Sequence, residues 1–195
     1  MAVAKTRPTT PARRHMTTQD FDQITTKKPV KSLIVIKKKT SGRNNAGRIT
    51  SRFRGGGRKQ FIRLVDFNPA AGQVATVEHI EYDPGRSARI ARLRDTEGNL
   101  SYTIATSGMH QGQTVRVAGD EKVAIENGNR MKLGDISLGA TINSIEITPG
   151  RGAQAVRAAG AGAQLVAKEG GYAMVRMPSG EVRRFSLESM ATIGT

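Results

Sequence analysis

Almost all the net charge of this chain lies in its first 60 residues. These residues contain 16 Lys and Arg against only Asp20 and Asp22, so they carry +14 of the total net charge of +15. Residues 61–195 contain 15 Lys and Arg and 14 Asp and Glu, and are nearly neutral. A segment with so much like charge cannot collapse into a core of its own. We therefore expect a long basic extension on a near-neutral body, with a polyanion as partner, most commonly a nucleic acid.

The composition narrows the class of protein further. The chain has no cysteine, which excludes a disulfide scaffold, a cysteine-based zinc site and a cysteine nucleophile, and fits the reducing cytoplasm. No apolar run approaches the roughly 20 residues needed to cross a bilayer, so we expect no membrane partner. Only 8 of the 195 residues are aromatic and 22 are glycine, a composition that fits a body supplemented by a coreless extension.

The extension, residues 1–59, divides into three parts. Residues 1–31 contain three prolines and few apolar residues, so we expect them to be extended and without a core. Residues 33–36 are apolar and predict a short strand or a docking segment. Residues 40–59 contain five glycines, six Lys and Arg and no acid. Glycine lets a backbone approach a phosphate closely, and arginine binds phosphate through two hydrogen bonds. A solvated flexible linker is the alternative, although linkers more often use serine and acidic residues.

The sequence of the body, residues 60–195, predicts an all-β fold made of two small barrels. Apolar alternation and turn residues indicate strands at residues 61–67, 74–82, 90–94, 100–105 and 115–117, which suit a first barrel over residues 60–120. A polar, glycine-containing stretch at 121–132 predicts a linker. Strands at 141–147, 165–167, 172–177, 182–185 and 191–193 suit a second barrel over 133–195, in which residues 153–163 form a loop or a turn of helix.

Nothing in the sequence predicts catalysis. His15, His79 and His110 are scattered, the acids are spread singly, and no phosphate-binding loop of the nucleotide-hydrolase type occurs. We therefore expect no catalytic residue, no metal, no cofactor and no small-molecule substrate. A binding protein fits better, and folded RNA fits better than duplex DNA, because no DNA-binding helix motif is present and a long irregular arm suits insertion between RNA helices.

The candidate RNA-binding residues are basic, amide or glycine residues of the extension, together with arginines at turns and strand ends of the body. Arg89 and Arg184 also lie at turns or strand ends of the body. For each body arginine the alternative is an ordinary solvated surface charge. The candidates are Arg13, Arg14, Arg43, Asn44, Asn45, Arg48, Arg52, Arg54, Gly55, Gly56, Gly57, Arg58, Lys59, Arg63, Arg86, Arg151, Arg157, Arg176 and Arg183.

Several of these residues lie in segments that together closely resemble the bacterial form of the universal ribosomal protein L2 family. The matching segments occur in order along the whole chain, at residues 5–15, 41–50, 55–60, 65–67, 81–88, 149–152, 155–160 and 176–183. The resemblance implies an oligonucleotide-binding (OB) type barrel followed by an SH3-like barrel. It also implies that Arg86 and Arg157 match arginines that family members use on RNA.

The resemblance further implies a structural constituent of the large ribosomal subunit in the cytoplasm. Its partners would be large-subunit ribosomal RNA, other ribosomal proteins and the small subunit, and it would support subunit association and the peptidyl-transferase region. The family normally continues past residues 191–194 into a basic tail rich in glycine and histidine, whereas this sequence ends at Thr195; roles of that tail are not carried over. The alternative from a different class is a free RNA-binding regulator or assembly factor built on the same barrels.

Overall fold

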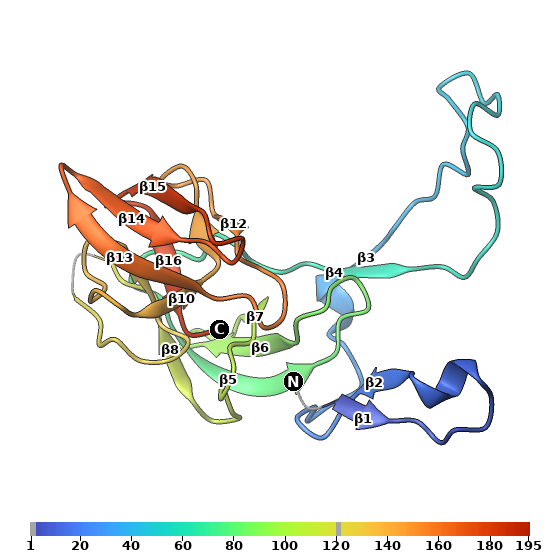
Figure 1. Cartoon of the computed structure of the whole chain (residues 1–195), viewed down its shortest axis with the longest axis horizontal. Helices are drawn as coiled ribbons and strands as arrows, with labels where there is room; N and C mark the ends of the chain where they lie inside the picture. The colour runs from blue at the N-terminus through green and yellow to red at the C-terminus, as the bar shows by residue number, and fades with distance from the viewer. Residues whose placement is uncertain (1–2, 120–121) are drawn as a thin grey trace.

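A computed structural model describes residues 3–119 and 122–195, and these residues form strands and loops with no α-helix. Figure 1 shows a body made of two packed β modules, from which two separate hairpins of the N-terminal region project. The all-β expectation is therefore confirmed. No helix in the described part of the chain is long and apolar enough to cross a membrane.

The N-terminal region contains two small antiparallel pairs and two 3₁₀ turns. Strands β1 (Val3–Lys5) and β2 (Thr17–Gln19) pair around the 3₁₀ turn η1 (Ala12–Arg14). The turn η2 (Lys31–Leu33) leads into β3 (Ile34–Ile36), which pairs with β4 (Phe61–Arg63). No residue from 4 to 74 is buried. The two small strand pairs give these residues more order than the sequence predicted, and their assignment to a separate extension stays a prediction.

The first module is a four-stranded antiparallel sheet in the order β7-β6-β5-β8. Its strands are β5 (Val74–Glu81), β6 (Ile90–Asp95), β7 (Leu100–Ile104) and β8 (Thr114–Arg116). The strands form because apolar residues alternate with polar ones, so that one face of the sheet is apolar. The sheet supplies the core residues Ala75, Val77, Ile80, Ala91 and Val115, and Met109 from the loop between β7 and β8 packs with them.

The second module is a six-stranded antiparallel sheet in the order β15-β14-β13-β10-β16-β9. Its strands are β9 (Arg130–Lys132), β10 (Thr141–Asn143), β13 (Ala163–Glu169), β14 (Tyr172–Arg176), β15 (Val182–Ser186) and β16 (Met190–Ile193). A separate pair joins β11 (Ile145–Glu146) to β12 (Ala153–Ala155). This module holds the larger core, with Met131, Leu133, Ile142, Leu165 and Val175 almost fully buried.

Two short strands of the second module were not expected from the sequence. Residues 130–132, which the sequence placed in the linker, form β9 and pair with β16 at the edge of the larger sheet. Residues 153–155, expected in a loop or a turn of helix, form β12. Both strands are short and are held by long-range partners, which local apolar patterns do not reveal. The division into domains beyond these strands stays a prediction.

Hydrogen bonds join the two modules at several places. The N–H of Ala118 donates to the carbonyl of Arg130 at 2.8 Å, and Val117 and Arg130 form a parallel bridge. The amide of Asn127 donates to Ser107 at 2.6 Å, and the N–H of Ala153 donates to Phe67 at 2.8 Å. The modules therefore form one body with a shared boundary.

Candidate RNA-binding surface

The longest projection of the molecule is the hairpin of residues 37–60, which we call the arm (Figure 1). Strands β3 and β4 form its root, and two further backbone bonds flank them. The N–H of Lys37 donates to Gln60 at 2.9 Å, and the N–H of Leu64 donates to Leu33 at 3.0 Å. The two limbs of the arm thus leave the body together, which holds the loop between them away from both modules.

The fold of the arm's tip depends on Gly42. Its carbonyl accepts hydrogen bonds from the N–H groups of Thr50 and Ser51 at 2.9 and 3.1 Å. Its φ of +72° is one that side-chain-bearing residues rarely adopt, and a Cβ atom there would collide with the Ser51 carbonyl oxygen. Glycine is therefore required at this position for the two limbs to come this close.

Two of the candidate RNA-binding side chains at the tip also shape the tip itself. The Asn44 side-chain oxygen accepts from the N–H of Arg48 at 2.9 Å, and the Arg43 guanidinium donates to the Gly47 carbonyl at 2.8 Å. These bonds close a tight turn across residues 44–47, beside the bridge that joins Arg43 to Ile49. Part of their hydrogen-bonding capacity is thus used within the protein.

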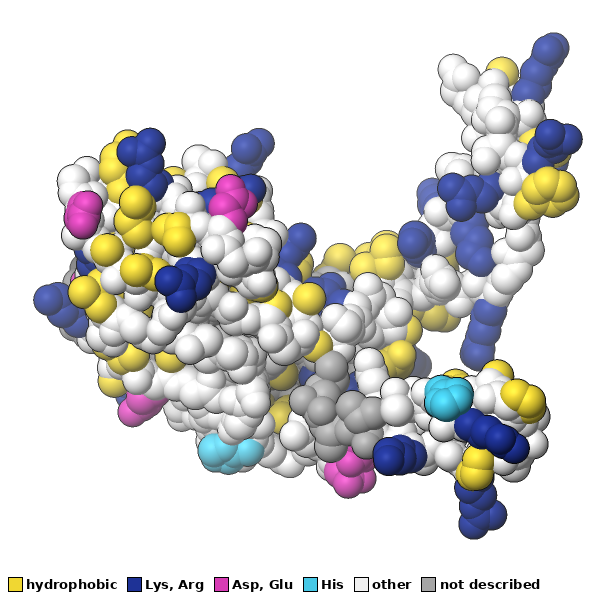
Figure 2. All heavy atoms as spheres, viewed as in Figure 1, with side chains coloured by type: hydrophobic (Ala, Val, Ile, Leu, Met, Phe, Trp, Pro, Cys, Tyr) yellow, Lys and Arg dark blue, Asp and Glu magenta, His cyan; other side chains and the backbone are white. Residues whose placement is uncertain are grey.

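The arm carries positive charge along its whole length. Figure 2 shows Lys and Arg side chains distributed along it, with a few hydrophobic ones between them and no acidic side chain on the visible face. The sequence contains no acid between Asp22 and Asp66. All the arm candidates are exposed: Arg43, Asn44, Asn45, Arg48, Arg52, Arg54, Gly55, Gly56, Gly57, Arg58 and Lys59. Such a projection attracts a phosphate backbone over most of its surface.

The second projection carries Arg13 and Arg14 on η1. Both side chains are exposed. The hydroxyl of Thr6 donates to the carbonyl of Arg13 at 2.9 Å, which folds the loop back toward β1. These two candidates therefore lie on a different hairpin from the arm.

In the body, the structure brings Arg86 and Arg157 together on the ring of Phe67. The guanidinium carbon of Arg157 lies 4.7 Å from the ring centroid, and that of Arg86 lies 5.5 Å from it. Phe67 precedes the first sheet, Arg86 follows β5, and Arg157 follows β12 of the second module. We call these three residues the Arg86–Phe67–Arg157 cluster. Cations over an aromatic face are favourably placed, and a guanidinium group binds phosphate oxygens through paired hydrogen bonds.

The position of Arg86 in the cluster is fixed by Asp83. The Arg86 Nε donates to the Asp83 carboxylate at 2.6 Å, and the other carboxylate oxygen accepts from the N–H of Gly85 at 2.8 Å. The Asp83 side chain is buried, whereas that of Arg86 is partly exposed. The turn of residues 83–86 therefore presents a guanidinium whose direction is set before any ligand binds.

The remaining body candidates lie outside this cluster. Arg151 is exposed on the turn before β12, and Arg176 is exposed at the end of β14. Arg183 on β15 is exposed and pairs with Glu181 at 2.9 Å. Arg63 on β4 is half-buried and donates to the Phe61 carbonyl at 3.3 Å. Their assignment to RNA binding stays a prediction.

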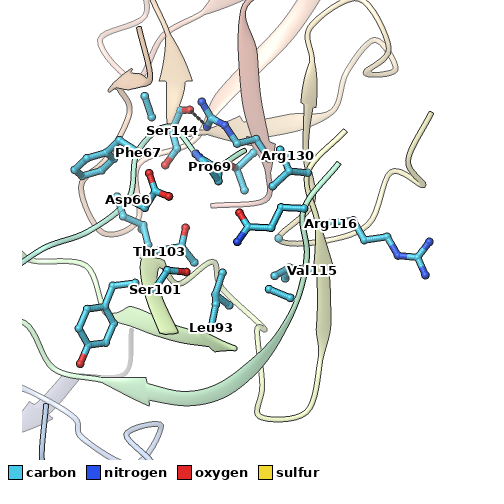
Figure 3. Close-up of a pocket in the computed structure, with 18 residues that line it drawn as sticks. Asp66, Phe67, Pro69, Leu93, Ser101, Thr103, Val115, Arg116, Arg130 and Ser144 are labelled. Carbon is cyan, nitrogen blue, oxygen red and sulfur yellow. Dashed lines mark hydrogen bonds between the residues drawn. The ribbon is translucent and has the colours of Figure 1, made fainter. Parts of the chain in front are cut away.

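The boundary between the modules contains a buried ion pair that positions other parts of the surface. Arg130 donates to the carboxylate of Glu146 at 3.0 Å and to the Ser144 carbonyl at 2.9 Å. Figure 3 shows Arg130 reaching toward Ser144 in a crevice that Asp66 and Phe67 also line, while Arg116 points away. Burial lowers the pKa of Arg130, and the attraction of Glu146 opposes that shift. Glu146 also accepts from the N–H of Gly150 at 3.3 Å, which supports the turn that carries Arg151.

Three residues of the surface were missed or misjudged in the sequence. Phe67 and Asp83 were not named as binding-site residues, although Phe67 contacts both arginines of the cluster and Asp83 orients Arg86. Arg89 was placed with exposed turn arginines, but it is buried, lies over the ring of Phe21 at 4.9 Å and donates to the Asp20 carbonyl at 2.6 Å. It therefore fastens the N-terminal region to the body. Contacts between residues so far apart in sequence leave no local pattern to read.

A basic projection, two β modules and arginines preset on an aromatic ring define a class of RNA-binding protein. In the described residues, no group of three or more His, Asp and Glu side chains could hold a metal ion. The family description "Ribosomal Proteins L2, RNA binding N-terminal domain" matches residues 30–117, and "Ribosomal Proteins L2, C-terminal domain" matches residues 126–195.

The chain is also similar to a curated protein. It is 50% identical over all 195 residues to "Large ribosomal subunit protein uL2" of Parabacteroides distasonis, and it spans 70% of that protein. The chain therefore belongs to the ribosomal protein L2 family. This membership confirms the expected ribosomal, non-catalytic class and agrees with an OB-type module followed by an SH3-like one.

Proposed function

We propose that this protein is a structural constituent of the large subunit of the cytoplasmic ribosome and binds large-subunit ribosomal RNA. The observation that carries this proposal is the arm: an exposed, acid-free, positively charged hairpin on a chain of the L2 family. A projection without a core of its own gains its contacts from a partner, and folded RNA offers both the charge and the shape.

The two kinds of basic surface suggest a division of roles. The arm neutralises phosphates over a long path, which supplies affinity. The Arg86–Phe67–Arg157 cluster holds its guanidinium groups in fixed positions, which sets the orientation of the body on the RNA. By its family resemblance, the bound protein supports association with the small subunit and the peptidyl-transferase region, next to other ribosomal proteins.

The experiment that tests the proposal is sedimentation of native lysate through a high-salt sucrose cushion, with this chain followed quantitatively. We expect one copy per large subunit in the pellet. Release into the supernatant while the ribosomes stay intact would contradict the structural role and favour a free RNA-binding factor.

A substitution in the cluster tests its part in binding. Arg157 is exposed and makes only a 3.4 Å bond to the Ala153 carbonyl besides its stacking, so Arg157→Ala should leave the fold intact. We expect weaker binding to large-subunit ribosomal RNA and a log–log salt slope shallower by about 1. Arg184→Ala is the matched control, because Arg184 also stacks on an aromatic ring, that of Tyr172, at 5.7 Å. Wild-type affinity of Arg157→Ala would remove Arg157 from the interface. Arg86→Ala is less suitable, since it would leave the buried Asp83 carboxylate without its cation.

A further inference from the structure

The tip of the arm presents an aromatic ring to solvent. Phe53 is 99% exposed, the most exposed of the large hydrophobic side chains in the described part of the chain. Ile49, on the same loop, is 60% exposed. A single exposed apolar side chain is common on protein surfaces, but Phe53 and Ile49 lie on the same projecting loop, in which no residue is buried.

The backbone at Phe53 is held in a conformation that phenylalanine rarely adopts. Its φ is +61°, in the left-handed region that a bulky residue enters only at a cost in free energy. The preceding residues are fixed, because the N–H of Ser51 bonds to Gly42 at 3.1 Å and the Gly42 backbone packs against the Ser51 carbonyl. The loop therefore directs the ring outward although no contact within the protein rewards that direction.

The positive charges around Phe53 indicate what kind of partner its ring contacts. Arg52 and Arg54 flank it, both exposed, and the sequence has no acid from residue 23 to residue 65. A protein core would not accept a ring flanked by two solvated cations. An unpaired RNA base offers a flat apolar face directly beside phosphates that the two arginines can bind, and such stacking between aromatic side chains and bases is common in RNA recognition.

We propose that Phe53 is a base-stacking residue: its ring packs on an unpaired base of large-subunit ribosomal RNA while Arg52 and Arg54 bind the neighbouring phosphates. This inference rests on the proposed function and specifies the contact made by the end of the arm. The arm would then bind RNA both through its positive charges and through a short-range stacking contact of Phe53.

The first test uses the absence of tryptophan from the chain. Phe53→Trp introduces a single fluorescent reporter at the tip, and Leu138→Trp places one at a 59% exposed site on the body as the control. We expect protein-free large-subunit ribosomal RNA to quench the Phe53→Trp emission strongly, because the indole stacks on a base, and to quench the Leu138→Trp emission far less. Equal quenching of the two reporters would overturn the proposal.

The second test measures affinity for the same RNA as a function of salt. Asparagine tolerates the left-handed conformation, so Phe53→Asn keeps the backbone and removes the ring. We expect Phe53→Asn to weaken binding by roughly 5- to 150-fold with an unchanged salt slope, and Phe53→Tyr to bind like the wild type. In contrast, Arg58→Gln should make the slope shallower by about 1.

The outcomes separate this inference from the proposed function. If the wild type binds tightly and Phe53→Asn binds equally well, stacking by Phe53 is wrong and the ribosomal role stands. If the wild-type protein does not bind large-subunit ribosomal RNA at all, the proposed function fails, and the stacking proposal fails with it.

Discussion

The arm and the body of this protein differ in whether their charges are paired within the protein. Every ion pair in the described residues lies between residues 78 and 183, within the body. The arm has cations without acids and no buried residue. The body is thus neutralised and packed by its own sequence, whereas the arm needs an external polyanion. The comparison shows that one chain can divide folding and binding between separate segments.

The body also contains charges that would be costly if left alone. Glu78 accepts from Arg94 at 2.6 Å, and this bond lowers the pKa of Glu78. Arg92 contacts both Glu78 and Glu81, at 2.9 and 3.3 Å. The less exposed groups among them, Arg92 and Glu81, stabilise the fold only while their partners are present. Removing one partner should therefore destabilise the body, whereas removing a charge from the arm should not.

The largest expected effect is at the module boundary. Arg130→Leu removes the cation that faces Glu146, a side chain that is only 1% exposed, and leaves that carboxylate buried and unpaired. We expect a loss of about 3–5 kcal/mol in the free energy of unfolding, measured by urea denaturation. Arg116→Leu, at an exposed arginine that points away from the boundary, is the control and should cost less than about 0.5 kcal/mol. Similar losses in both variants would show that the pair between β9 and β11 does not stabilise the fold.

A smaller effect is expected where the arm joins the body. The fully buried Tyr102 hydroxyl donates to Glu81 at 2.8 Å and accepts from the N–H of Val30 at 2.9 Å. Tyr102→Phe leaves both groups without this partner, so we expect a loss of about 1–3 kcal/mol in the free energy of unfolding. Thermal and urea denaturation measure it. An unchanged stability would mean that the hydroxyl does not fasten the arm's root.

The same tyrosine predicts how stability depends on alkaline pH. Burial raises the pKa of Tyr102 to about 12, from 10.0. The folded state therefore keeps the proton that the unfolded state loses above pH 10. Its stabilising contribution is complete below pH 10 and declines as the pH rises to about 12. Tyr102→Phe should show less decline over that interval, and an identical pH profile would contradict the assignment.

The smallest effect on stability is expected within the arm. Gly42→Ala should change the free energy of unfolding by less than about 0.5 kcal/mol, because the arm contributes nothing to either core. It should nevertheless weaken RNA binding by roughly 10-fold or more, since a Cβ would collide with the Ser51 carbonyl and deform the tip. Gly47→Ala is the matched control: its φ is +73°, but nothing lies within 4 Å of the added atom. Equal affinities for these two variants would show that the shape of the tip is unimportant.

The parts of the structure that the sequence predicted are those encoded by local patterns. Alternation over residues 74–82 gives β5, and the Pro-Gly turn at 84–85 ends the segment that presents Arg86. The parts that it did not predict depend on distant partners. Val35 pairs with Ile62 only because the intervening arm returns to its own root. Arg89 is buried because Phe21 and Tyr82 close over it, and a basic residue beside a turn gives no sign of that.

The root of the arm has a consequence for how the protein is assembled with its partner. Both limbs are fastened to one residue, since Val30 bonds to the Tyr102 hydroxyl and the N–H of Asp66 bonds to the Tyr102 carbonyl at 2.8 Å. Once the body has docked, this shared tether confines the tip to a small volume near its target. The effective concentration of the tip is then far above that of a free peptide, and the second contact forms as an intramolecular step. Tight overall binding can thus arise from two contacts that are each weak and reversible. A misplaced complex that makes only one of these contacts dissociates quickly, and the protein can then bind at the correct site.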